Sequence, residues 1–324
     1  MSNDDEEEVG YGNTHRAFLQ ALLSRQTITY EDAKPLLAAI QTAAIPDRPT
    51  LPEDISYQDF DNYVHTLNSS ISPFDFEIRS TLHQTTKECI YALVNTTSDA
   101  LTQMATVHSA DEIAFVKRVL DAMFDTHNTQ RAEVMAVTSM QALKLAKPPN
   151  DGSRRESGTQ AHAQAGLTMS QAEKTLENMV REGWFELSTR GFYTLSPRGL
   201  MELRGWLMDT YNDQPPDEGD DDEYEEPTEK IKLCRACKEI VTMGQRCPNM
   251  ECLARLHNHC VRNMFRAQGG SEKCPMCKTD WVEPPPVGEK AAKAGRTSTN
   301  ANGVGGRRRT SGMGMDGADD ESDD

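Results

Sequence analysis

Seven of the chain's eight cysteines lie between Cys234 and Cys277, and this clustering constrains the fold more than any other feature of the sequence. Together with one histidine they form closely spaced pairs: Cys234, Cys237, Cys247, Cys252, His257, Cys260, Cys274 and Cys277. Two residues separate the partners of each pair, except that four separate Cys247 from Cys252. Thiolate sulfur and imidazole nitrogen are the ligands that zinc prefers, four to a tetrahedral site. Eight such ligands therefore predict two zinc ions.

Disulfide bonding is the alternative use of these cysteines. The N-terminus reads MSNDDEEEVG, which is acidic where a secretory signal needs a cationic start and an apolar core. Cysteines that are not exported stay reduced, so metal binding is favoured. Cys89 lies in the apolar run ECIYALV and is expected to be a small core residue, not a ligand.

A cross-braced arrangement assigns alternate pairs to the same ion. The first zinc would then be held by Cys234, Cys237, His257 and Cys260, and the second by Cys247, Cys252, Cys274 and Cys277. His259 could replace His257, but it would leave no residue before Cys260. We therefore expect His259 to be a supporting or surface residue.

The net charge of −17 is concentrated in three runs that contain no base, at 4–8, 213–229 and 316–324. Such runs repel themselves and are usually solvated. We therefore predict a disordered acidic tail at 1–10 and an acidic linker at 213–229. Residues 284–324 are rich in Pro, Gly, Lys and Arg and show no core-forming pattern, so we predict a disordered tail there as well. No run of apolar residues is long enough to suggest a membrane span.

The remaining residues show the same order of elements twice, with helices followed by a β-hairpin. In 11–107, amphipathic helices precede a hairpin formed by Phe74–Gln84 and the run ECIYALV. In 108–212, a helix over Glu133–Ala146 and others precede the hairpin GWFELS-TRG-FYTLS, with a mobile loop at about 148–166. This order predicts an α+β protein with tandem winged-helix domains, followed by a small two-zinc cross-brace domain at 230–283.

Several residues mark the expected helix ends in these two domains. Thr29 and Ser109 are predicted N-caps, the latter with Glu112 in a capping box. Ser170 and Glu173 predict a second box, Gly183 the end of that helix, and Ser196-Pro197 the start of the last one.

Winged helices bind DNA or dock proteins. A helix that reads the DNA groove needs cationic side chains, and the helix opening at Ser170 carries only Lys174 up to Val180. Protein docking is therefore favoured, and direct DNA contact stays open as the alternative.

The ligand order of four cysteines, one histidine and three cysteines is shared by RING domains of ubiquitin ligases and by PHD fingers that read histone tails. PHD fingers carry a tryptophan two residues before the seventh ligand, where this chain has Glu272. RING domains favour a proline inside the last pair, as in Cys274-Pro275-Met276-Cys277, and a central helix such as CVRNMFRA after Cys260. These residues favour RING.

The motifs CRACKEIVTMGQRC, LHNHC and CPMCKTDW, together with the preceding domains, resemble the non-structural maintenance of chromosomes element 1 family, RING-like subunits of the SMC five/six repair complex. The resemblance implies a nuclear ubiquitin ligase acting in DNA repair and recombination. Its implied partners are a MAGE-type winged-helix subunit, a kleisin subunit and a ubiquitin-conjugating enzyme. The four-residue gap after Cys247 is longer than expected and leaves the shape of the second zinc site open.

The resemblance also suggests which residues would contact the conjugating enzyme. They are Ala236 in the first pair, Phe265 in the central helix, Pro275 in the last pair and Lys278 just after it. Lys278 could equally be a plain surface lysine, and Ala236 is smaller than the usual apolar residue. Two hypotheses follow, a working ligase and a zinc-stabilised scaffold that docks a partner without appreciable activity. A PHD-type histone reader is the third.

Overall fold

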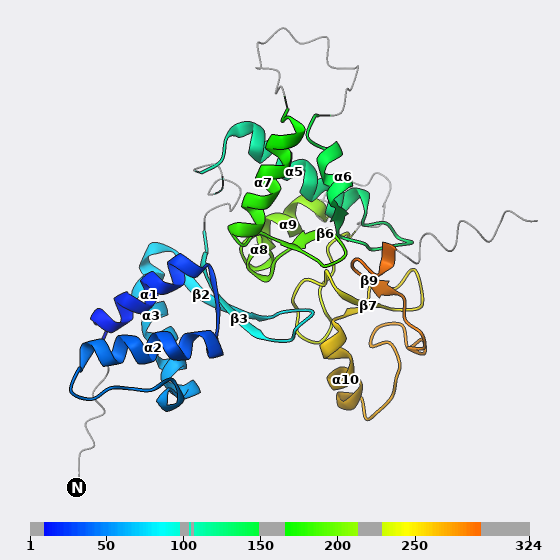
Figure 1. Ribbon diagram of the computed structural model, residues 1–324. Coiled ribbons are helices and arrows are strands. Elements are labelled where there is room, and N and C mark those ends of the chain that lie inside the picture. Colours follow the sequence, from blue (N-terminus) through cyan, green and yellow to red (C-terminus); the bar gives the residue numbers. More distant parts are fainter. Residues whose placement is uncertain (1–9, 98–103, 105–106, 149–165, 213–228, 293–324) are drawn as a thin grey trace, which may run out of the picture.

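The computed structural model describes residues 10–97, 104, 107–148, 166–212 and 229–292 (Figure 1). Nearly all of the predicted tail at 1–10, loop at 148–166 and linker at 213–229 lies outside the described residues. The described residues form two helix-and-hairpin units and a C-terminal module that carries the cysteines. Among them, no helix is long and apolar enough to cross a membrane.

The first unit has three helices and a three-stranded antiparallel sheet in the order β1-β3-β2. Its elements are α1 (Asn13–Arg25), β1 (Thr27–Thr29), α2 (Tyr30–Ala44), α3 (Tyr57–Ile71), β2 (Phe76–Leu82) and β3 (Cys89–Asn95). Apolar residues at helical spacing, among them Phe18, Leu37 and Phe60, meet in its core because each helix has one apolar face. The predicted hairpin and the Thr29 cap are confirmed, and Cys89 packs against this core.

The second unit repeats this order and adds two helices. Its elements are α5 (Ala110–Asp121), β4 (Val137–Thr138), α6 (Ser139–Lys144), α7 (Met169–Arg181), β5 (Phe185–Leu187), β6 (Phe192–Leu195), α8 (Pro197–Glu202) and α9 (Arg204–Tyr211). Its sheet order, β4-β6-β5, again places the last strand of the hairpin in the middle. This repeated order is the one on which the winged-helix prediction rests.

Three local predictions in the second unit hold and two are corrected. Ser109 and Ser196 cap their helices, and Gly183 follows α7 with a left-handed φ of 74° that suits glycine. The capping box of α7 is formed by Thr168 and Gln171, not by Ser170 and Glu173. The helix predicted over Glu133–Ala146 is reduced to α6, because Met135 has a φ of 43° that no helix accommodates. 

The C-terminal module contains β7 (Gly244–Arg246), β8 (Arg255–Leu256), α10 (Asn258–Ala267) and β9 (Pro286–Val287), with sheet order β8-β7-β9. Gly244 is required in β7, because an added Cβ would lie 2.3 Å from the carbonyl oxygen of Leu256. The tail predicted from residue 284 begins too early, since β9 pairs with β7 and Ala291 is buried. The module therefore extends to at least residue 292.

The module and the second unit share one continuous core, whereas the first unit has its own. The two ends of the undescribed acidic run are also joined, since Asn212 and Glu229 form an antiparallel bridge. The Asn212 side chain exchanges two hydrogen bonds with the backbone of Ile231, of 2.8 and 3.1 Å. The module therefore packs directly on the second unit, on either side of the predicted acidic linker at 213–229.

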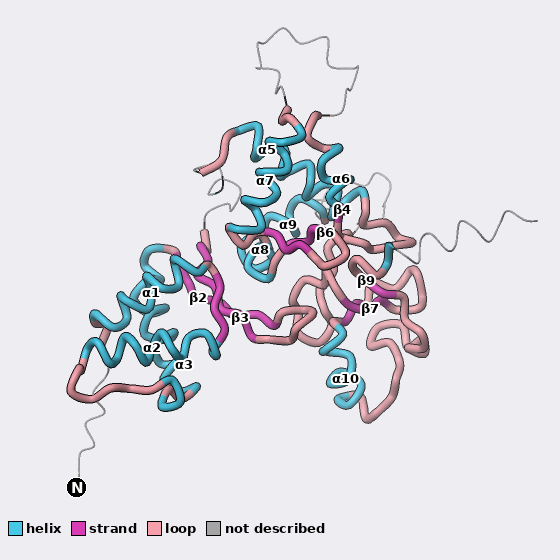
Figure 2. Tube along the Cα trace, in the orientation of Figure 1, coloured by secondary structure: helices cyan, strands magenta, loops and turns pink. Residues whose placement is uncertain are grey.

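Both hairpins end against the module. The hairpin β2–β3 projects from the first unit to the module (Figure 2), and Gln84 at its tip bonds Ile240, Thr242 and Met243. In the second unit, Ser188 between β5 and β6 donates to Glu289 of the module at 2.6 Å. The tips of both hairpins thus contact the module through hydrogen bonds.

Candidate zinc centres

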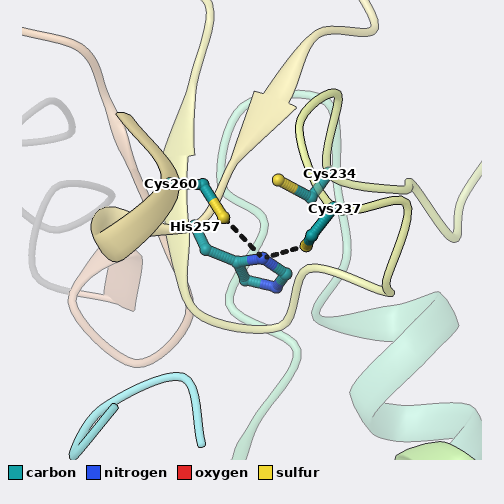
Figure 3. Close-up of side chains that lie close together, drawn as sticks. All are labelled: Cys234, Cys237, His257 and Cys260. Atoms are coloured by element: carbon teal, nitrogen blue, oxygen red, sulfur yellow. Dashed lines mark hydrogen bonds between the residues drawn. The ribbon is translucent and has the colours of Figure 1, made fainter. Parts of the chain in front are cut away.

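The first predicted ligand set comes together at the start of α10 (Figure 3). One ligand atom from each of its residues lies within 4.8 Å of the others: Cys234, Cys237, His257 and Cys260. The Nδ1 atom of His257 lies 3.2 Å from the Cys237 sulfur and 4.0 Å from the Cys260 sulfur. His257 therefore offers Nδ1 to an ion. His259 stacks on the His257 ring and is outside the group, as expected.

The second set also comes together, with the same 4.8 Å limit: Cys247, Cys252, Cys274 and Cys277. Its sulfur atoms lie 3.5 Å apart for Cys247 and Cys277, and 3.7 Å apart for Cys252 and Cys274. Four sulfurs bound at about 2.3 Å around one tetrahedral zinc stand roughly 3.8 Å from one another. The donor set and spacing therefore fit zinc at both groups, and the cross-braced partition is the predicted one.

The thiols are tuned differently by their surroundings. Burial raises the pKa of Cys247 and Cys252, and raises that of Cys260 to about 11. A hydrogen bond with the Thr279 side chain lowers the pKa of Cys277 to about 6. Zinc binds thiolates, so ion binding must displace protons from the buried thiols.

The first and last cysteine pairs adopt the same turn. The Cys234 amide donates to the Glu239 carbonyl and the Cys274 amide to the Thr279 carbonyl, both at 2.8 Å. Lys238 and Lys278 each close the turn with a φ of 64°. Both pairs are thus shaped by backbone hydrogen bonds that aim two sulfurs at one ion.

A hydrogen-bond chain that the sequence does not reveal supports the first site. The Nε2 atom of His257 lies 3.1 Å from the Ile240 carbonyl oxygen, which fixes the tautomer with Nδ1 free for metal. Gln84 donates to the same carbonyl at 2.9 Å and accepts from the Met243 amide at 2.7 Å. The hairpin of the first unit thus reaches a metal ligand through a single carbonyl.

The four residues predicted to dock a conjugating enzyme differ in exposure. Ala236 and Lys278 are exposed, and Pro275 is partly exposed. Phe265 is only 7% exposed and packs edge-on against Trp281, with ring centroids 5.9 Å apart. Phe265 can therefore support a docking surface only from beneath.

Comparison with known families and structures agrees with this geometry. A family model described as "RING-like domain" matches residues 234–277. The module is therefore a RING-like domain, as predicted over a PHD finger. The protein class is that of an α+β chain with two helix-and-hairpin units and a C-terminal RING-like zinc domain.

A second family model, described as "Nse1 non-SMC component of SMC5-6 complex", matches residues 15–203. The chain belongs to this Nse1 family, as its motifs predict. It is similar to the non-structural maintenance of chromosomes element 1 homolog of Homo sapiens, with 22% identity covering 83% of this chain and 84% of the relative. The Schizosaccharomyces pombe protein is 24% identical, covering 88% and 99%. A solved chain described as "Nse1-Nse3-Nse4 complex" has a TM-score of 0.59 at 22% identity, covering 84% and 98%.

Proposed function

We propose that the chain is a RING-type ubiquitin ligase subunit of an SMC five/six complex that acts in DNA repair and recombination in the nucleus. The observation that carries the proposal is the RING-like domain with accessible Ala236, Pro275 and Lys278 around its two cysteine turns. Membership in the Nse1 family supports the complex.

In this proposal the chain supplies no nucleophile. It binds a ubiquitin-charged conjugating enzyme and holds the thioester in a reactive orientation, so catalysis is positioning. The two zinc ions stabilise the fold of the surface that does this and take no part in the chemistry. Lys278, held by the turn after Cys274, would contact both ubiquitin and the conjugating enzyme.

The proposed partners are the MAGE-type winged-helix subunit and the kleisin subunit that the family resemblance implies. The name of the similar solved assembly, "Nse1-Nse3-Nse4 complex", supports this choice. Protein docking is also supported over DNA by α7, where exposed Glu173 and Glu177 balance Lys174 and Arg181.

The test is reconstitution of ubiquitin transfer with a panel of conjugating enzymes, with and without the MAGE-type partner. We expect chain formation that P275A and K278A reduce by about tenfold, the effect of roughly 1.4 kcal/mol in transition-state positioning. P248A and K273A are the matched controls, because Pro248 also follows a zinc ligand and Lys273 also flanks the last pair. Loss of activity in the controls as well would indicate general disruption of the domain.

A zinc-stabilised scaffold without appreciable transfer activity is the second candidate. The small Ala236 and the buried Phe265 favour it, because both reduce the apolar surface offered to a conjugating enzyme. No transfer with any enzyme, together with stable binding of the partner subunit, would establish the scaffold.

A further inference from the structure

Three charged side chains are buried together where the module meets the second unit, and a fourth, that of Lys232, lies beside them and is 11% exposed. Glu133 of the second unit is 1% exposed, and it accepts from Arg255 in two bonds, Nε to Oε2 at 2.6 Å and Nη2 to Oε1 at 2.5 Å. Lys232 donates to the same carboxylate at 2.9 Å. Arg246, also 1% exposed, has its Nη1 atom 3.8 Å from Glu133 Oε1. Burying charged side chains costs free energy unless they are paired and hydrogen-bonded with one another.

The two arginines flank the longer loop of the second zinc site. Arg246 precedes the ligand Cys247 and donates to the Met250 carbonyl at 3.0 Å. Arg255 follows the ligand Cys252 and donates to the Cys252 carbonyl at 2.7 Å. Both guanidinium groups therefore hold the loop between Cys247 and Cys252. This loop is longer than in the other pairs, and the sequence alone does not determine its shape.

The charges of this cluster do not cancel. One carboxylate against three cations leaves two positive charges in a region that is shielded from water. One zinc ion with four thiolates carries two negative charges. For Glu133, burial opposes ionisation, but the bonds to Arg255 and Lys232 outweigh it and lower the pKa.

We propose that Arg246 and Arg255, held in place by Glu133 of the second unit, compensate the charge of the four-thiolate zinc site and fix its ligand loop. They are positioning residues for the metal and do not touch it. The second zinc site thus depends on the module, which supplies its ligands and both arginines, and on the second unit, which supplies Glu133. The three-thiolate site, whose complex with zinc carries one negative charge less, meets the cluster through the backbone instead, since Arg255 pairs with Cys234 in a β-bridge.

The experiment measures zinc release from the full chain loaded with two zinc ions and challenged with excess chelator. R246M removes the charge and the hydrogen bonds, while R246K keeps the charge. Substitution of groups that support metal ligands typically costs about 10–100-fold in metal affinity. We expect R246M to accelerate release of one ion by about this factor and R246K to restore most of the retention. K230M is the matched control, because Lys230 also pairs with a carboxylate of the second unit, Asp125, outside the cluster.

The site that loses its ion is identified with Co²⁺-substituted protein, because four-thiolate and three-thiolate sites differ in their ligand-field absorption. Selective loss from the four-thiolate site in R246M, with recovery in R246K and no change in K230M, supports the proposal. Equal acceleration at both sites, or no acceleration in R246M, overturns it. Equal behaviour of R246M and R246K overturns the role of charge.

Discussion

The two zinc groups lie in one small domain but are supported in different ways. The group with three thiolates and His257 is reached by a neutral hydrogen-bond chain, from Gln84 through the Ile240 carbonyl. The group with four thiolates is flanked by a buried ionic cluster around Glu133. An ion pair, Arg204 with Glu239, also lies near the first group, but its side chains are 36% and 49% exposed. Solvent screening makes such exposed pairs weak.

This difference follows the charge of the sites. A site with more thiolates is more anionic when zinc is bound, and the surrounding low dielectric makes a fixed cation more effective. The supports also come from different units, Gln84 from the first and Glu133 from the second. The comparison therefore predicts that loss of Gln84 weakens zinc retention at the site of His257, and that loss of the Glu133 charge weakens the four-thiolate site and its contact with the second unit.

Removal of the Glu133 charge should have the largest effect. E133Q keeps the size of the side chain but leaves the buried Arg246 and Arg255 and the partly buried Lys232 without a carboxylate. Breaking a buried pair in this way costs about 3–5 kcal/mol. Hydrogen exchange of the full chain should show lost protection in the module and in the second unit, which share a core, while the first unit keeps its protection.

The matched control for this change is E289Q. Glu289 also joins the module to the second unit, through Ser188 and Arg190, but the Arg190 side chain is 33% exposed. E289Q should therefore cost no more than about 1 kcal/mol. Equal losses in both variants would show that the buried cluster has no special weight in the interface.

Removal of the neutral support should have a smaller effect, on the other site. Q84A leaves the Met243 and Thr242 amides without their acceptor, and an unpaired buried group costs about 1–3 kcal/mol. We expect faster release of zinc from the site of His257, measured with the same chelator assay, and unchanged release from the four-thiolate site. T85V is the control, since the hydroxyl of Thr85 at the same hairpin tip donates to the Met243 sulfur and not to the Ile240 carbonyl. Faster release from both sites would contradict separate supports.

Most of the regular elements and the ligand partition could be predicted from the sequence because they depend on local signals. Spacing brings Cys234 and Cys237 into one turn, and apolar periodicity places Phe18 and Phe60 in a core. The end of α7 follows from Gly183, which tolerates a left-handed backbone. Such signals depend on residues close together in the sequence, so they can be read without knowledge of the tertiary structure.

The supports of the zinc sites could not be predicted, because they depend on contacts between distant residues. Glu133 lies in a stretch that reads as a helix, and its partner Arg255 is 122 positions away. Charged residues are normally exposed, so a buried arginine has no local signal beyond its position next to a ligand. Composition likewise identifies the acidic run but not that Asn212 and Glu229 at its ends are paired.

The smallest expected effect tests whether the hairpin of the first unit is also held by charge. His83, beside Gln84, lies 3.1 Å from Glu186 of the second unit, and this hydrogen bond raises the His83 pKa above its usual 6.5. A raised folded pKa means that the stabilisation is complete below pH 6.5 and is lost as the pH rises through the folded value.

H83Q should therefore lower the free energy of unfolding, measured by denaturation at several pH values, and most on the acid side of this window. The loss should be no more than about 1 kcal/mol, because the Glu186 side chain is 42% exposed. E186Q should give the same pH profile, and the double variant should add nothing further, since both substitutions remove one interaction. A destabilisation that grows towards alkaline pH would show that the contact is not an ion pair. In that case the contact between His83 and Glu186 would be a neutral hydrogen bond, unlike the cluster at Glu133, which depends on charge.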